Sequence, residues 1–140
     1  MANSNKSEEI NAVTCECKAD EITILPCSGG SNCGQIANQA AVSLDNLGVG
    51  TNYCLAGIGA HIDGMVESAK SAKRLVAIDG CKVACAKKTI EHAGLKVTDW
   101  ICLTDEGISK SHNFALEETD IEMITQKVKE LLSKPARSAR

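Results

Sequence analysis

The chain has 140 residues and a mass of 14.8 kDa, the size of one domain that buries about two-thirds of its unfolded surface. Hydrophobic residues make up 44% of it and aromatic residues only 2%, so a disordered chain is excluded and the core must be aliphatic. Fifteen basic and eighteen acidic residues leave a net charge of −3, which argues against nucleic acid as a partner.

The first part of the chain, residues 1–20, is polar and without periodicity, and we expect it to form a flexible arm. From residue 21 the sequence alternates four times between a short apolar run and a longer stretch with helical spacing, which is the pattern of βα units. The first strand is predicted at 22–25. The helix after it is predicted over 36–47 and ends at Gly48.

The next two units follow the same plan. A weak apolar run at 52–55 precedes a helix over 65–72, and its place in the alternation supports a second strand. The clearest strand is 75–78. Directly after it, Asp79 is expected to cap a helix that Gly94 ends.

The last unit closes the domain. A fourth strand is predicted at 100–103, and Thr119 and Glu122 have the spacing of a capping box for a final helix over 121–132. The basic tail, residues 134–140, is expected to be a solvated terminus.

Together these units predict a single α/β domain over residues 21–133. Right-handed crossovers place helices on both faces of an open parallel sheet, so we expect a doubly wound, Rossmann-like sandwich of about four strands in the order 2-1-3-4. The loop over 27–34 contains neither the G-x-G-x-x-G fingerprint of dinucleotide sites nor a P-loop.

The eight cysteines are the outlier of the composition. No apolar run approaches the roughly 20 residues that cross a bilayer, and residues 1–9 are polar where a secretory signal is apolar. We therefore expect a cytoplasmic protein with no membrane contact. In that reducing compartment cysteines serve as metal ligands or redox groups more often than as structural bridges.

Three of the cysteines recur at a fixed interval. Cys27, Cys54 and Cys81 are 27 residues apart, about one βα unit, and each follows an apolar run. The carboxyl ends of parallel strands share one edge of the sheet, where open α/β folds bind ligands, so we expect these sulfurs to converge there. Cys85 lies four residues after Cys81, which on a helix returns to the same face.

Four thiolates at one point suit Zn²⁺ in tetrahedral coordination, and an iron–sulfur cluster is the competing cofactor. The predicted helix start near Cys81 favours a thiolate, and Lys82, Lys87 and Lys88 can balance its charge. Two other interpretations stay open: thiols used in redox or sulfur transfer, and cysteines that only fill the top of a core.

The remaining cysteines are less informative. Cys33 is an extra ligand or a resolving thiol, while Cys102, within the fourth strand, is expected to be buried in the core. Cys15 and Cys17 form a C-x-C pair on the predicted arm, which can capture or hand over metal.

Five segments together resemble the DGC-domain proteins, a family of small prokaryotic proteins named for an Asp-Gly-Cys motif. They are Ile78-Asp79-Gly80-Cys81 and its continuation to Thr89, Cys27-Ser28-Gly29, residues 35–41, Cys54 to Gly59, and Leu103-Thr104-Asp105. The resemblance covers about residues 21–132.

The resemblance implies a zinc-binding protein. The four ligands presumed for the family fall on Cys27, Cys54, Cys81 and Cys85, the set that the spacing also selects. The additional Cys33 and Cys102 and the C-x-C pair depart from the usual pattern and leave open a larger or second metal site.

The leading hypothesis is therefore a zinc-binding protein that acts as a metal carrier, a sensor or a metal-dependent catalyst, with the metal ion as its partner. The alternatives are a thiol redox or sulfur-transfer enzyme and an iron–sulfur electron-transfer protein. Whether the chain catalyses a reaction stays open, because no complete set of nucleophile, base and oxyanion donors is visible. His61 and His112 follow the second and fourth strands, and we expect exposed or capping roles for both.

Overall fold

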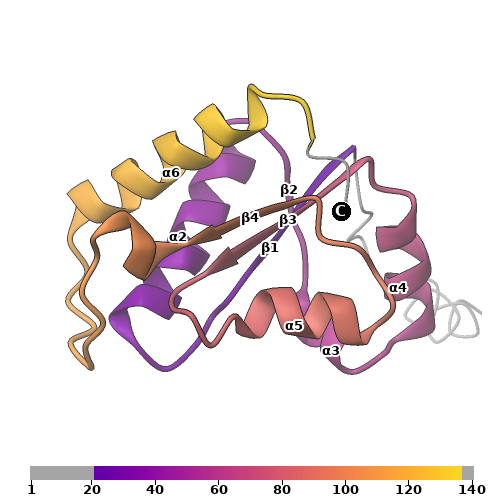
Figure 1. Ribbon diagram of the computed structural model, residues 1–140, viewed down its shortest axis with the longest axis horizontal. Helices are drawn as coiled ribbons and strands as arrows, with labels where there is room; N and C mark the ends of the chain where they lie inside the picture. Colours follow the sequence, from indigo (N-terminus) through magenta and orange to yellow (C-terminus); the bar gives the residue numbers. More distant parts are fainter. Residues whose placement is uncertain (1–20, 137–140) are drawn as a thin grey trace, which may run out of the picture.

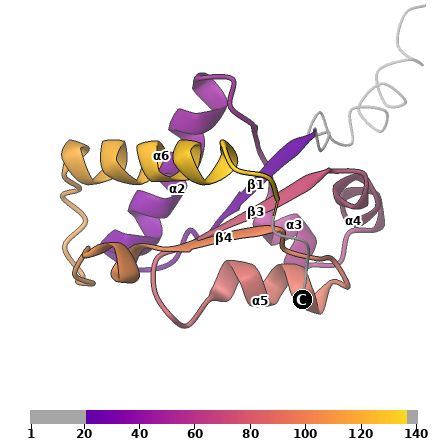
Figure 2. The same cartoon turned by 45° about the horizontal axis from the view of Figure 1, so that its top comes forward.

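The computed structural model describes residues 21–136 of the chain. Helices pack on both faces of a four-stranded parallel sheet (Figures 1 and 2). In chain order the elements are β1 (Ile22–Pro26), α2 (Asn32–Asn46), β2 (Thr51–Asn52), α3 (Leu55–Gly59), α4 (Asp63–Lys70), β3 (Arg74–Asp79), α5 (Cys85–His92), β4 (Asp99–Cys102), the 3-10 helix η1 (Leu103–Glu106) and α6 (Glu118–Leu132).

The strand order is β2-β1-β3-β4, and every neighbouring pair is parallel, which confirms the predicted topology. β1 and β3 are the two central strands, with Ile24 opposite Val76. Because all strands run the same way, the segments that leave their carboxyl ends meet at one edge of the sheet, where α5 begins (Figure 1).

The core has two parts, one on each face of the sheet. Alternate residues of β3 point to opposite sides: Val76 and Ile78 pack under α2 and α6, whereas Leu75 and Ala77 pack against α3, α4 and α5. Figure 2 shows the two helical layers on either side of the strands. Burial on both faces explains why the strand sequences read as continuous apolar runs.

Two of the predicted helix ends are confirmed. Gly48 and Gly94 follow α2 and α5 with φ of 72° and 78°, the left-handed region that glycine enters without a steric penalty. The N–H groups of Val49 and Leu95 close these ends by donating to carbonyls of the last helical turns, at 2.9 and 3.2 Å.

Several predicted boundaries differ from the structure, and α2 begins at Asn32, four residues before its predicted start. β2 is shorter than the predicted run, since only the N–H of Tyr53 still reaches the β1 carbonyl of Ile24 and Cys54 then caps α3. α5 begins at Cys85 rather than directly after Asp79. The capping box is wrong, because α6 already begins at Glu118, which leaves Thr119 inside its first turn.

Other expectations concern residues outside this description. The predicted arm over residues 1–20, with Cys15 and Cys17, and residues 137–140 of the basic tail lie outside the described part of the chain. Within residues 21–136, no helix combines the length and the apolar composition needed to cross a bilayer.

Candidate functional site

Three of the four candidate cysteines line one pocket at the carboxyl edge of the sheet. Cys27 follows β1, Cys81 follows β3, and Cys85 is the first residue of α5; with Lys110 and the loop glycines they surround a cavity of about 190 Å³. The parallel strands bring Cys27 together with Cys81 and Cys85 although more than fifty residues separate it from them in sequence.

Cys27 is the most enclosed of the three. Its side chain is 9% exposed, and its backbone N–H donates to the carbonyl of Ile78 at 2.8 Å, which fixes the residue between β1 and β3. Burial raises the pKa of the Cys27 thiol above its ordinary value. Backbone N–H groups of Gly29 and Gly80 act in the opposite direction by hydrogen bonding to the sulfur.

Asp79 organises the segment that carries the other two sulfurs. Its carboxylate is buried and accepts hydrogen bonds from the N–H groups of Ala86 and Lys87 at 2.7 and 3.1 Å. It also accepts one from Trp100 Nε1 at 2.9 Å. The predicted capping role is thus confirmed, but it is exerted across a turn, so that Cys85 takes up the first position of the helix.

Gly80 is required by a close approach of two backbones. A Cβ added there would lie 2.7 Å from the carbonyl carbon of Cys33 and from the N–H nitrogen of Gly34, at the start of α2. Only glycine lets the end of β3 pass this close to α2. The first two residues of the Asp-Gly-Cys motif therefore have structural roles that place the third.

The link between Cys81 and Cys85 differs from the predicted one. Residues 81–84 form a turn in which the N–H of Ala84 donates to the carbonyl of Cys81 at 3.0 Å, and Ala84 has a left-handed φ of 57°. The two cysteines therefore share the pocket through a turn and not through one helical face. The helix start lies at Cys85 and not near Cys81.

The lysine beside the sulfurs is not one of those predicted from the sequence. Lys110 Nζ lies 3.4 Å from Cys81 Sγ. Of the lysines singled out in the sequence, Lys82 pairs with Asp105 at 3.3 Å and Lys87 lies over the ring of Trp100. Sequence reasoning missed Lys110, and the available signal was its place in the loop after the fourth strand, at the same edge.

Cys54 lies next to this pocket and not in it. It is the exposed N-cap of α3, and its sulfur accepts a hydrogen bond from the N–H of Gly57 at 3.4 Å. The hollow that it lines includes Pro26 and Ser28, the two neighbours of Cys27 in sequence. Among residues 21–136, no three Cys, His, Asp or Glu side chains are gathered tightly enough to hold a metal ion.

The remaining candidates do not line the pocket, although Cys33 lies directly behind its lining residue Gly80. Cys33 and Cys102 are buried, as expected for Cys102, with their sulfurs near the carbonyl of Ile108 and the hydroxyl of Thr104. Burial raises the pKa of the Cys33 thiol. His112 packs against the ring of Phe114, whereas His61 meets His92 at the end of α5 opposite to Cys85.

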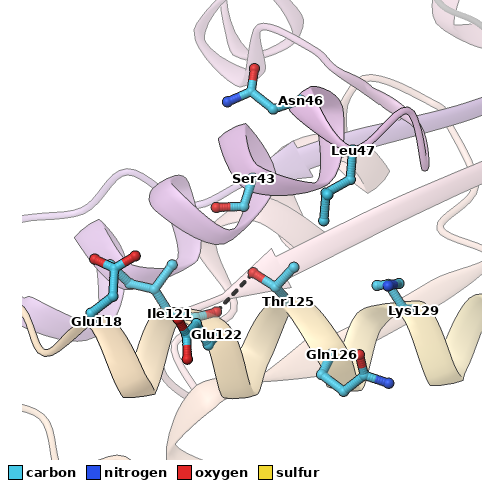
Figure 3. A pocket seen from close by; sticks show the side chains of 9 residues that line it. All are labelled: Ser43, Asn46, Leu47, Glu118, Ile121, Glu122, Thr125, Gln126 and Lys129. Carbon is cyan, nitrogen blue, oxygen red and sulfur yellow. Dashed lines mark hydrogen bonds between the residues drawn. The ribbon is translucent and has the colours of Figure 1, made fainter.

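A further hollow lies between α2 and α6 (Figure 3). Leu47 and Lys129 are among the side chains that line it. Within α6, the Thr125 hydroxyl donates to the carbonyl of Ile121 at 2.8 Å. None of its lining residues is a cysteine or histidine. This hollow therefore offers no thiol or imidazole ligand.

A parallel α/β domain whose strand ends carry cysteines defines the class of protein. The chain belongs to the DGC-domain family, whose model matches residues 23–128. It is similar to the "Anaerobic and virulence modulator AnvM" of Pseudomonas aeruginosa strain PAO1, with 30% identity over 110 residues that cover 79% of this chain and 84% of that protein. No solved structure matches the chain.

Proposed function

We propose that the chain binds a thiolate-preferring metal ion, with Zn²⁺ as the ion and Cys27, Cys54, Cys81 and Cys85 as its ligands. The observation that carries the proposal is the shared pocket of Cys27, Cys81 and Cys85, three sulfurs from two segments far apart in sequence, at the ligand-binding edge of the fold. Zinc and other soft or borderline ions favour such a donor set.

The surroundings of the sulfurs support thiolate chemistry. Backbone N–H groups face Cys27 and Cys54, an ammonium group lies beside Cys81, and Cys85 stands at a helix N-terminus. All six cysteines in the described part of the chain are free of disulfides. Positive charge or partial charge thus accompanies each of the four candidate ligands, and at Cys27 it opposes the burial that raises the pKa of the thiol.

Ion binding requires a local rearrangement, because Cys54 lines the neighbouring hollow. Cys54 and Cys85 are both exposed, so rotation of their side chains meets little packing resistance. Cys27, held between β1 and β3, is the fixed point of the site. The name of the Pseudomonas relative, a modulator, favours a sensing role over catalysis.

A thiol redox function is the second candidate, and the Lys110–Cys81 contact is the observation that favours it. In that reaction the Cys81 thiolate attacks a disulfide substrate and expels one substrate thiol. Cys85 then displaces the second thiol, so that the substrate is reduced and a Cys81–Cys85 disulfide is formed.

The decisive experiment is elemental analysis of protein purified without oxygen, in a background in which Cys15→Ser and Cys17→Ser remove the C-x-C pair. We expect about one zinc per chain, with affinity reduced at least about tenfold by Cys27→Ser or Cys81→Ser. Cys102→Ser is the matched control and should retain the zinc. A zinc content that neither Cys27→Ser nor Cys81→Ser changes contradicts the site. If the analysis finds iron and sulfide in place of zinc, the cofactor is an iron–sulfur cluster. Metal-free protein that forms a reversible Cys81–Cys85 disulfide supports the redox function.

A further inference from the structure

Two histidines meet on the surface at a distance from the cysteine pocket. His61 Nε2 lies 3.1 Å from His92 Nδ1, and the rings stand nearly perpendicular, at 86°. Both side chains are exposed. His61 follows α3 and His92 is the last residue of α5, so the pair joins the carboxyl ends of two helices.

The separation of the two nitrogens matches chelation of one metal ion. Nitrogens bound to the same ion at about 2.0–2.1 Å, with angles between about 90° and 109°, lie roughly 2.9–3.4 Å apart. Either imidazole nitrogen can be a ligand when the proton occupies the other one. Moving the shared proton to the outer nitrogen of its own ring therefore leaves two lone pairs facing each other across 3.1 Å.

The scaffold fixes this arrangement in advance. α3 and α5 are packed closely, since a Cβ at Gly59 would come within 3.2 Å of Thr89 Cγ2. His61 has a left-handed φ of 56°, a conformation that glycine or asparagine adopts more easily. This conformation ends α3, where the N–H of Ile62 donates to the carbonyl of Gly57 at 3.1 Å, and it holds the His61 backbone in place beside α5.

The local charge suits a cation. The carbonyl groups at the end of α5 give that end a partial negative charge, which favours positive ions near His92. Both imidazoles are open to water, so solvent can complete the coordination sphere of an ion that they hold.

We infer that His61 and His92 form a second metal site, which takes a divalent transition-metal ion such as Zn²⁺ through two imidazole nitrogens. The site shares no ligand with the four cysteines and does not depend on the function proposed above. Its two histidines lie at the opposite ends of α3 and α5 from Cys54 and Cys85, each seven residues after the cysteine in sequence.

The test is a Zn²⁺ titration of untagged, reduced, full-length protein, followed by NMR of the imidazole resonances. The chain has three histidines, so His112 serves as an internal control. We expect the ring signals of His61 and His92 to shift together while those of His112 stay in place. The imidazole signals report on these two rings alone. The outcome is therefore the same whether or not the four cysteines bind zinc.

Variants sharpen the test. His61→Asn suits the left-handed backbone. This substitution and His92→Gln, each made alone, should weaken Zn²⁺ binding at the remaining ring at least about tenfold, whereas His112→Asn should have no effect. Backbone amide spectra establish that each variant is folded. The inference is overturned if neither ring responds up to about 1 mM Zn²⁺, or if one ring binds equally well without the other.

Discussion

Asp79 concentrates three hydrogen bonds on one buried carboxylate, from Ala86, Lys87 and Trp100. Asp79→Ala leaves these donors without a partner, and we expect the free energy of unfolding to fall by about 3 kcal/mol. Urea denaturation monitored by circular dichroism measures the loss. Asp105→Ala is the control, because the Asp105 pair with Lys82 is exposed and should contribute no more than about 0.5 kcal/mol. Equal losses in the two variants would show that Asp79 does not hold α5.

Gly80 offers a test of backbone packing with a matched control in the same site. Gly80→Ala places a methyl group 2.7 Å from backbone atoms of Cys33 and Gly34, so β3 or α2 must shift. We expect a loss of about 1–3 kcal/mol together with weaker metal binding. Gly30→Ala has open space around its Cβ and should change stability by less than about 1 kcal/mol. If both substitutions are tolerated equally, the close approach is not a constraint.

The buried thiol of Cys33 should make the free energy of unfolding depend on pH in the alkaline range. Burial raises the pKa of this thiol above its ordinary value, so the folded protein holds the proton more tightly than the unfolded chain does. The resulting stabilisation is complete below the ordinary thiol pKa and is lost as pH rises through the folded value. Between about pH 8 and about pH 10, wild type should therefore lose more stability than Cys33→Ala, by at most about 1.4 kcal/mol per pH unit. Urea titrations under reducing conditions measure this, and parallel declines would contradict it.

At the scale of elements, Arg74 connects β3, β4 and the end of α6 at the amino edge of the sheet. Its guanidinium binds both carboxylate oxygens of Asp99 at 2.6 and 3.0 Å, which links β3 to β4. It also donates to the carbonyls of Leu132 and Lys134, at the end of α6. The side chains of Arg74 and Asp99 are only 14% and 2% exposed, so the pair is held away from water.

Arg74→Met should therefore destabilise the protein by about 3 kcal/mol, because it leaves the Asp99 carboxylate buried without its cation. The double variant Arg74→Met, Asp99→Leu should recover much of that loss, since an apolar pair of similar volume avoids desolvation of charge. Thermal and urea unfolding measure both. Lys73→Met is the control, as its ion pair with Glu21 is exposed. A double variant less stable than Arg74→Met would refute this account.

The elements that the sequence predicts well are those whose pattern is local. The periodic stretches of α2 and α6 and the apolar run of β3 were all predicted, because amphipathic spacing and buried strands leave a direct trace in the sequence. The start of α5 was misplaced because it depends on a carboxylate that reaches across a turn. β2 was hard to recognise because two residues suffice when a central strand lies beside them.

For the molecule as a whole, the strand order could be predicted because it follows from handedness rules and not from individual residues. The same rules correctly place Cys27 and Cys81 at one pocket. They cannot specify side-chain details at that edge. The offset of Cys54 and the approach of Lys110 to Cys81 depend on loop conformations that carry no periodic signal.

The distribution of the core indicates that the domain does not need a metal ion to fold. Two apolar clusters cover the two faces of the sheet, and within the described residues every fully buried side-chain nitrogen and oxygen has a hydrogen-bond partner. The cysteine pocket lies at the edge of these clusters. The ion that we propose would thus add stability to a structure that already exists, in contrast to small zinc domains that unfold without metal.

Removal of metal by a chelator should therefore lower the melting temperature and leave the helical circular dichroism spectrum unchanged at 25 °C. Zinc at about 1,000 times its dissociation constant should add about 4 kcal/mol to the free energy of unfolding, because it binds the folded state alone. In Cys27→Ser the melting temperature should respond far less to zinc, since the fixed point of the site is lost. Collapse of the helical spectrum upon chelation would instead mean that the ion holds the loops of β1 and β3 together, and that the two clusters do not suffice to fold the domain.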